Sequence, residues 1–121
     1  MFTIDLMSRV PVYEQIIEQM ENFVIKGVLS AGTQVPSVRS LSVQLSINPN
    51  TIQKAYTELD RRGIIYSVPG RGCFISDTAM DILCNNKRKQ LEDLKNLLKE
   101  LSLVGVTKDE VISIVTETFE N

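Results

Sequence analysis

The chain has 121 residues, 43% of them hydrophobic, which suffices for one compact domain of about 100 residues or a smaller domain with an appendage. That length is too short for most enzymes with a two-lobed cleft. Its 13 basic and 15 acidic residues give a formal net charge of -2, a balance that taken alone argues against a nucleic-acid-binding protein.

The N-terminal part predicts a short segment followed by a helix. Phe2, Ile4 and Leu6 alternate with polar residues, a spacing that fits either a brief strand or an arm packed on the core. Pro11 suits a first helical turn, and from there apolar residues recur at helical spacing until Gly27. We expect the buried face of this helix to consist of Ile16, Ile17, Met20, Phe23 and Val24.

Residues 28–35 are predicted to be a connector, because turn residues are frequent there and Pro36 follows. Ser37 then caps a short helix. The inward residues of that helix are expected to be Val38, Leu41 and Leu45. A turn over residues 46–48 leads into the next element, and this order is typical of a helix-turn-helix motif.

The second helix of the motif has the clearest boundaries in the sequence. Asn48 can cap it, Pro49 suits its first position, and Gly63 can end it. Its inward stripe is expected to be Ile52, Ala55, Tyr56 and Leu59, and its outward polar stripe Asn50, Gln53, Lys54 and Thr57. One face therefore packs inward while the other is free to meet the edge of a base.

A two-stranded hairpin is predicted after this helix. Residues 64–66 and 73–75 favour strands, and the turn cluster 68–72 separates them. The complete order is that of a winged helix-turn-helix, with the hairpin as the wing. Residues 36–72 contain five basic and two acidic residues, a local net charge of +3 that leaves -5 for the rest of the chain.

The tail predicts helices that need a partner. A long helix starts around residues 76–78, and Gly105 interrupts it before a last helix with a capping box at Thr107 and Glu110. Residues in the long helix recur every three or four positions, a spacing typical of the contact line between two packed helices. We expect this contact line at Leu91, Leu94, Leu98 and Leu101, and Cys84 and Lys87 continue the same spacing. These leucines fit either an intramolecular core or, in the reading we favour, the interface of a homodimer.

Four segments together resemble a known family. They are PVYEQI at 11–16, AGTQVPSVRSL at 31–41, INPNTIQKAYTELDRRGII at 47–65 and GRGCFI at 70–75. In this order and spacing they resemble the GntR family of bacterial transcription regulators, and the short helical tail resembles its YtrA-like subfamily. The expected fold is mainly α with a small β-hairpin wing, divided into a DNA-binding domain over 1–76 and a helical dimerisation tail over 77–121.

The resemblance implies a homodimeric regulator, expected to be a repressor, that binds an inverted repeat in double-stranded DNA. By position, Ser37 and Arg39 would contact phosphate and groove. The recognition helix would contribute Asn48, Asn50, Thr51, Gln53 and Lys54, and the wing tip Gly70, Arg71 and Gly72. Many relatives have an arginine where this sequence has Pro49, so the base contacts of that arginine do not transfer.

The residue chemistry suits this role. Backbone N–H groups at the start of the second helix can face a phosphate, Asn50 and Gln53 can pair with adenine, and Lys54 can reach guanine, each worth about 1–3 kcal/mol of discrimination. The alternative for this stripe is a solvated helix face. For Arg71 the alternative is an ordinary hairpin turn. The positions of Arg61 and Arg62, in the last turn of the helix, are better explained by a favourable interaction with the helix dipole.

Other functions have less support in the sequence. A winged-helix module that binds proteins without DNA is the main alternative, motivated by the acidic net charge. No metal-ligand cluster, phosphate-binding glycine loop or nucleophile elbow points to an enzyme, and no cofactor is expected. Neither a signal peptide nor a membrane span is indicated, and the two unpaired cysteines fit the cytoplasm. No small-molecule effector can be identified, and a pocket of about 300 Å³ would need two tails.

Overall fold

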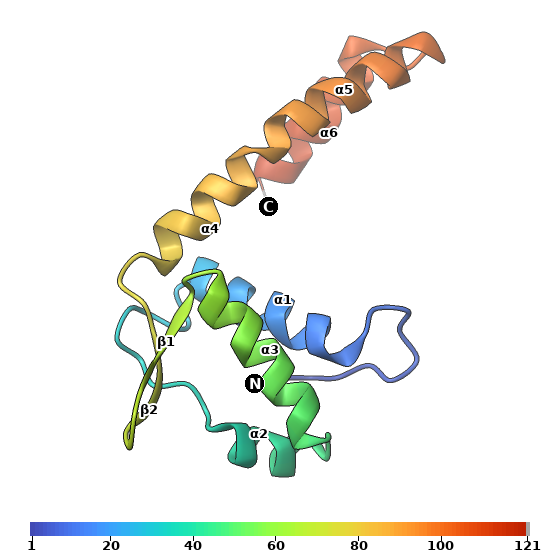
Figure 1. The fold of residues 1–121 in the computed structure, drawn as a ribbon. Helices are drawn as coiled ribbons and strands as arrows, with labels where there is room; N and C mark the ends of the chain where they lie inside the picture. Colours follow the sequence, from blue (N-terminus) through green and yellow to red (C-terminus); the bar gives the residue numbers. More distant parts are fainter. Residues whose placement is uncertain (121) are drawn as a thin grey trace. The chain divides into compact units, whose positions relative to one another are not determined.

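The computed structural model describes residues 1–120 and contains six α-helices and one two-stranded sheet within them (Figure 1). The elements in chain order are α1 (Val12–Ile25), α2 (Val38–Leu45), α3 (Pro49–Arg61), β1 (Ile65–Val68), β2 (Gly72–Ile75), α4 (Ala79–Arg88), α5 (Gln90–Leu103) and α6 (Lys108–Glu120). The chain forms two compact units that divide after Asn85. This division falls within α4, later than the expected boundary between residues 76 and 77, because Ala79 and Leu83 are buried in the core of the first unit.

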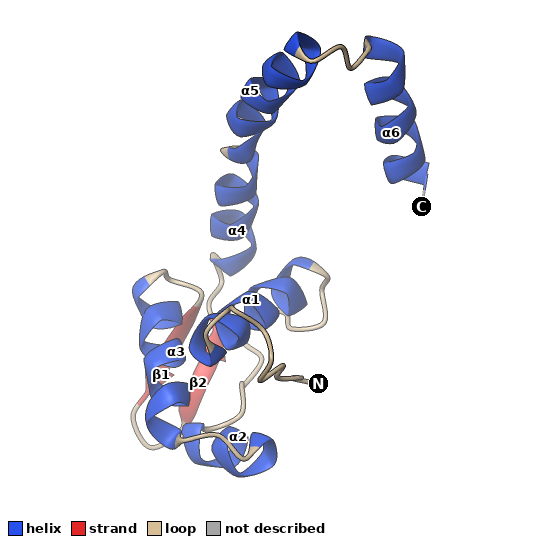
Figure 2. Cartoon of the chain, turned by 90° about the vertical axis from the view of Figure 1, so that its right-hand side faces the viewer, coloured by secondary structure: helices blue, strands red, loops and turns tan. Residues whose placement is uncertain are grey.

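The first unit is built around α3. This helix packs against α1, α2 and β1, and the hairpin lies beside it (Figure 2). All four residues of the predicted inward stripe are buried, namely Ile52, Ala55, Tyr56 and Leu59. They meet the buried residues of α1, of which Ile16, Ile17, Met20 and Val24 had been predicted. The inward stripe of α3 is therefore confirmed, and so is that of α1 except at Phe23, which is half-buried at the edge of the core.

The caps of the helix-turn-helix also form as predicted. The Ser37 hydroxyl oxygen accepts a hydrogen bond from the Ser40 N–H at 3.0 Å, and Asn48 Oδ1 accepts from the Asn50 N–H at 2.8 Å. Between the helices Ser46 adopts a left-handed conformation with φ 56°, which reverses the chain in few residues. The start of α3 is thereby fixed relative to α2.

The N-terminal segment is an arm and not a strand. Phe2 is buried, and its ring contacts that of Phe23 edge-on with centroids 5.3 Å apart. The Gln15 amide bonds both the N–H and the carbonyl oxygen of Asp5, each at 2.9 Å. Because side chains of α1 already satisfy the backbone of the arm, it has no need of a neighbouring strand.

The hairpin is antiparallel, with Ile65 opposite Ile75 and Val68 opposite Gly72. The connector before α2 runs along its outer edge, where the Val35 N–H donates to the Cys73 carbonyl at 2.9 Å. The structure thus confirms a mainly α fold with a β-hairpin wing directly after the helix-turn-helix.

The second unit differs in one respect from the expectation. The long helix predicted from around residues 76–78 until Gly105 is assigned as α4 and α5, and Lys89 between them keeps helical backbone angles, with φ -61° and ψ -24°. The side chains on both sides of Lys89 are exposed. The predicted capping box does form, because the Thr107 N–H donates to Glu110 Oε2 at 3.0 Å and the Glu110 N–H to Thr107 Oγ1 at 3.2 Å.

Candidate nucleic-acid interface

The predicted polar face of α3 is exposed along its length. Asn50, Gln53, Lys54 and Thr57 all have exposed side chains. The opposite face is fixed, since the buried Tyr56 hydroxyl donates a hydrogen bond of 2.6 Å to the Pro36 carbonyl. Helix α3 is therefore held in the core by one face and presents the other to solvent.

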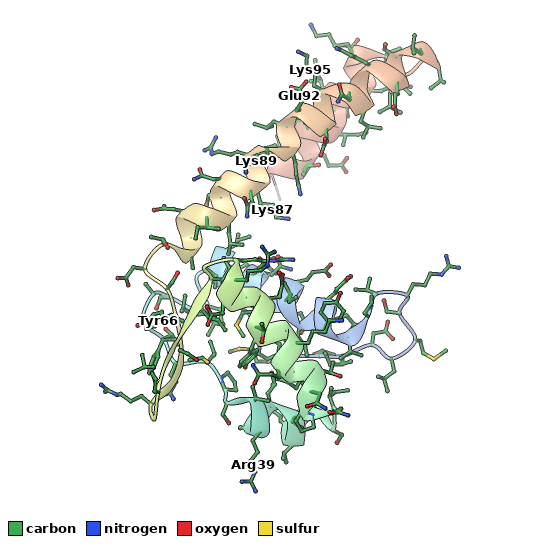
Figure 3. All side chains as sticks on the ribbon, in the orientation of Figure 1. Arg39, Tyr66, Lys87, Lys89, Glu92 and Lys95 are labelled. Carbon is green, nitrogen blue, oxygen red and sulfur yellow. The ribbon has the colours of Figure 1, made fainter. Side chains whose placement is uncertain are left out.

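Three of the predicted contact residues serve as structural groups at helix starts. Ser37 and Asn48 use their side-chain oxygens as caps, and the half-buried Thr51 donates its N–H to the Asn48 carbonyl at 3.0 Å. Arg39 is different, because it is exposed and projects from α2 into solvent (Figure 3). Of these predicted contact residues, Arg39 is therefore the one whose side chain extends freely into solvent.

The polar residues of α3 share one shallow hollow on the surface of the first unit. Its lining includes Asn50, Gln53, Lys54 and Thr57, together with Tyr13 of α1. Gln53 also borders a groove between α3 and the hairpin, lined on the hairpin side by Ser67 and Cys73. The structure thus brings the predicted recognition residues of α3 together, next to the groove that α3 forms with the hairpin.

Lys54 is held by an aromatic ring. Its ammonium nitrogen lies 3.9 Å from the centroid of the Tyr13 ring, a cation–π contact. The Tyr13 hydroxyl in turn donates to Glu14 Oε1 at 3.2 Å, and this bond to a carboxylate raises the pKa of the phenol.

Two basic residues at the end of α3 and just after it form ion pairs. Glu58 accepts two hydrogen bonds of 3.1 Å from Arg61, which lower the pKa of its carboxyl, and it lies 3.8 Å from Arg62 Nε. Arg62 also contacts Glu21 at 3.3 Å. Within residues 1–120, Arg39, Lys54 and Arg71 form no ion pair. Arg61 and Arg62 thus have glutamate partners in the fold, whereas the basic residues predicted to contact DNA on α2, α3 and the wing have no ion-pair partner in the described part of the chain.

The wing tip has a backbone that suits glycine. Gly70 and Gly72 have φ values of 76° and 118°, which side-chain-bearing residues rarely adopt. The Gln34 side chain donates a hydrogen bond of 2.8 Å to the Arg71 carbonyl, and its amide nitrogen would lie only 2.6 Å from a Cβ atom at Gly72. Arg71 itself is exposed at the tip.

Sequence reasoning missed two residues of this surface. Tyr13 lies under Lys54, and Gln34 fastens the wing tip. Both stand in segments that resemble the family, yet helical or strand periodicity gives neither residue a role, because each acts on an element distant in sequence.

Comparison with known proteins decides the family. Residues 12–75, more than half of the chain, match the model described as bacterial regulatory proteins of the gntR family. The chain belongs to the gntR family. This member is 41% identical over 118 residues to the HTH-type transcriptional repressor YtrA of Bacillus subtilis, covering 97% of the chain and 91% of that protein.

Solved structures agree with this family assignment. The crystal structure of a transcriptional regulator from Oenococcus oeni is similar with a TM-score of 0.77 and 36% identity, covering 97% of this chain and 98% of that one. The structure of AraR(DBD) in complex with operator ORX1 has a TM-score of 0.55 and 28% identity, covering 61% of this chain and 92% of that chain. The predicted resemblance to the GntR family and to YtrA is confirmed.

The gntR-family protein is thus a DNA-binding transcription regulator, and its relatives are regulators and not enzymes. In the described part of the chain, no helix has both the length and the apolar character needed to cross a membrane. The same residues include no group of three or more His, Cys, Asp and Glu side chains placed to hold a metal ion.

Proposed function

We propose that the protein is a homodimeric repressor that binds an inverted-repeat operator, with α3 in the major groove of each half-site and the wing beside it. The observation that supports this role best is the exposed polar face of α3, where Asn50, Gln53 and Lys54 surround one hollow. On this proposal Arg39 contacts phosphate, and Arg71 contacts the backbone or minor groove from the wing tip.

The second unit supports a dimer. Among residues 90–120 no side chain is fully buried. Leu91 and Leu94 are 60% and 48% exposed, while Leu98 and Leu101 line an apolar groove with residues of α6. Figure 2 shows α5 and α6 joined by a loop and diverging from one another. Helices that bury so little apolar surface gain little stability alone, and a second copy of the chain provides the missing surface.

The repressor role rests on the relative named as a transcriptional repressor, and the operator on the relative solved with an operator. A dimer related by a two-fold axis reads two half-sites in opposite directions, so an inverted repeat follows from the symmetry. Occupation of such a site near a promoter would block transcription.

The test is fluorescence anisotropy against the DNA upstream of the protein's own gene and a scrambled duplex, over a series of salt concentrations. We expect selective binding whose affinity falls steeply with salt, because each neutralised phosphate releases counterions. Lys54→Ala and Gln53→Ala should each reduce selectivity about 5- to 150-fold, the equivalent of about 1–3 kcal/mol. Lys26→Ala removes the same charge from an exposed site at the end of α1 and serves as the control. Unchanged selectivity in both α3 variants would refute the choice of recognition face.

The dimer is tested separately by sedimentation of the full chain. Wild-type protein should sediment with twice the mass of one chain, and Leu98→Glu or Leu101→Glu should shift it towards the monomer and weaken operator binding. Asn96→Glu introduces the same charge on α5 outside the leucine row and should leave the dimer intact. A monomeric wild-type protein that still binds an inverted repeat tightly would contradict this assignment of the tail.

A further inference from the structure

The contact between Lys54 and Tyr13 joins the recognition helix to α1, the helix packed behind it. The ammonium nitrogen lies 3.9 Å from the ring centroid. Tyr13 is half-buried and packs against the hydrophobic core, so its ring has a fixed place, whereas the Lys54 side chain is exposed. A long flexible lysine on the surface is thus restrained by a group that the core holds.

One carboxylate has the sequence spacing that commonly pairs with a lysine such as Lys54, but arginines already bind it. Glu58 lies one helical turn further along α3, the spacing at which lysine and glutamate commonly pair. Its carboxylate is instead bonded by Arg61 and lies close to Arg62, which also contacts Glu21. Both arginines therefore keep Glu58 from Lys54, and the aromatic ring is the group left to attract the ammonium.

The difference matters for binding an anion. A carboxylate would neutralise Lys54 and would have to be displaced before a phosphate or guanine could approach. An aromatic ring attracts the cation through its quadrupole and carries no net charge. The ammonium therefore has a preferred position on the α3 face and keeps its full charge.

We infer that Tyr13 is a positioning residue for Lys54, restraining the ammonium at the recognition face of α3 while leaving its charge available for a guanine edge or a phosphate. This inference rests on the proposed function of α3. It adds a residue of α1 to the determinants of sequence selectivity, although Tyr13 itself touches no base. Restraint before binding reduces the side-chain entropy that the complex must lose.

The test is a double-mutant cycle on operator selectivity with the full chain. Tyr13→Leu should reduce selectivity for operator over scrambled DNA about two- to fivefold, the range for an exposed cation–π contact. Tyr13→Phe keeps the ring and loses only the bond to Glu14, so it should bind like the wild type. In a Lys54→Ala background Tyr13→Leu should have no further effect. An equal loss in both backgrounds, a loss in Tyr13→Phe as large as in Tyr13→Leu, or tighter binding by Tyr13→Leu would overturn the inference.

A second readout does not depend on DNA or on the leucine variant. In the free protein the aromatic ring should shift the ε-methylene protons of Lys54 upfield in NMR spectra of the wild type and of Tyr13→Phe. Tyr13→Met, with an unbranched apolar side chain, should abolish the shift, and random-coil values in the wild type would refute the contact. If the wild type binds no operator but shows the shift, the proposed function fails and the positioning role fails with it. If operator binding is selective and Tyr13 has no effect, only the positioning role fails.

Discussion

Gly72 is the position where the wing should tolerate a side chain least. Its φ of 118° is one that other residues rarely adopt, and an added Cβ would lie 2.6 Å from the amide nitrogen of Gln34. That nitrogen donates the 2.8 Å hydrogen bond to the Arg71 carbonyl. Gly72→Ala is therefore expected to strain the backbone and, at the same time, to displace the side chain that fastens the tip.

The two effects have different sizes. Holding a non-glycine residue in such a conformation costs about 1–3 kcal/mol. The hydrogen bond contributes about 0.5–1.5 kcal/mol, and the lower end applies because Gln34 is exposed. The amide nitrogen of Gln34 is at the end of a flexible side chain and can move aside, so the steric clash itself adds little to the loss of stability. We expect Gly72→Ala to lower the free energy of unfolding by about 2–3 kcal/mol.

Urea denaturation of Gly72→Ala, of Gln34→Ala and of the double variant separates the backbone strain from the loss of the hydrogen bond. Gln34→Ala removes the hydrogen bond and the clash, so Gly72→Ala should cost about 0.5–1 kcal/mol less in that background than in the wild type. Gly70→Ala is the matched control, because φ is 76° there and nothing lies within 4 Å of the added Cβ. Strict additivity of the two changes, or a Gly72 variant as stable as the wild type, would refute the reasoning.

Three further perturbations test the first and second units. Tyr56→Phe should lower the free energy of unfolding by about 1–2 kcal/mol, measured by urea denaturation, because the Pro36 carbonyl loses its partner. The bond from Arg61 holds the pKa of the Glu58 carboxyl below its ordinary value, so this pairing stabilises the fold above that ordinary value and is lost as pH falls through the lowered pKa. Glu58→Gln should accordingly lower the urea midpoint at neutral pH, and the difference from the wild type should disappear in acid. Thr107→Ala removes the cap of α6 and should cost that helix about 1 kcal/mol, visible as faster hydrogen exchange in its first turn.

The arrangement of the first unit was predictable because local rules and the global fold agree there. The cap at Asn48, the proline after it and the apolar stripe through Ile52 each point to the same helix, and the structure has that helix over Pro49–Arg61. The exposed polar stripe follows directly from the same periodicity. Whether its residues contact bases stays a prediction, because periodicity states which face is exposed and not what covers it.

Other features depend on groups that meet only in the folded chain. The N-terminal alternation allowed a strand or an arm, and the buried Gln15 amide, which bonds the backbone of Asp5, decides for the arm. Tyr13 and Gln34 act on α3 and on the wing from segments far away in sequence, so no single-element pattern contains them.

A net charge of -2 does not conflict with DNA binding, because the charges are unevenly distributed over the chain. A count of charges treats every arginine alike, whereas the structure pairs Arg61 with Glu58 and Arg62 with Glu21 and Glu58, and leaves Arg39 and Lys54 without an ion pair among the described residues. Phosphates respond to the local field within about 8–10 Å at ordinary salt, so distant acidic residues weaken it little. Because the arginines hold the Glu58 carboxylate, Lys54 keeps an unneutralised charge on the exposed face of α3, and a negative net charge of the whole chain does not exclude a local attraction for phosphate.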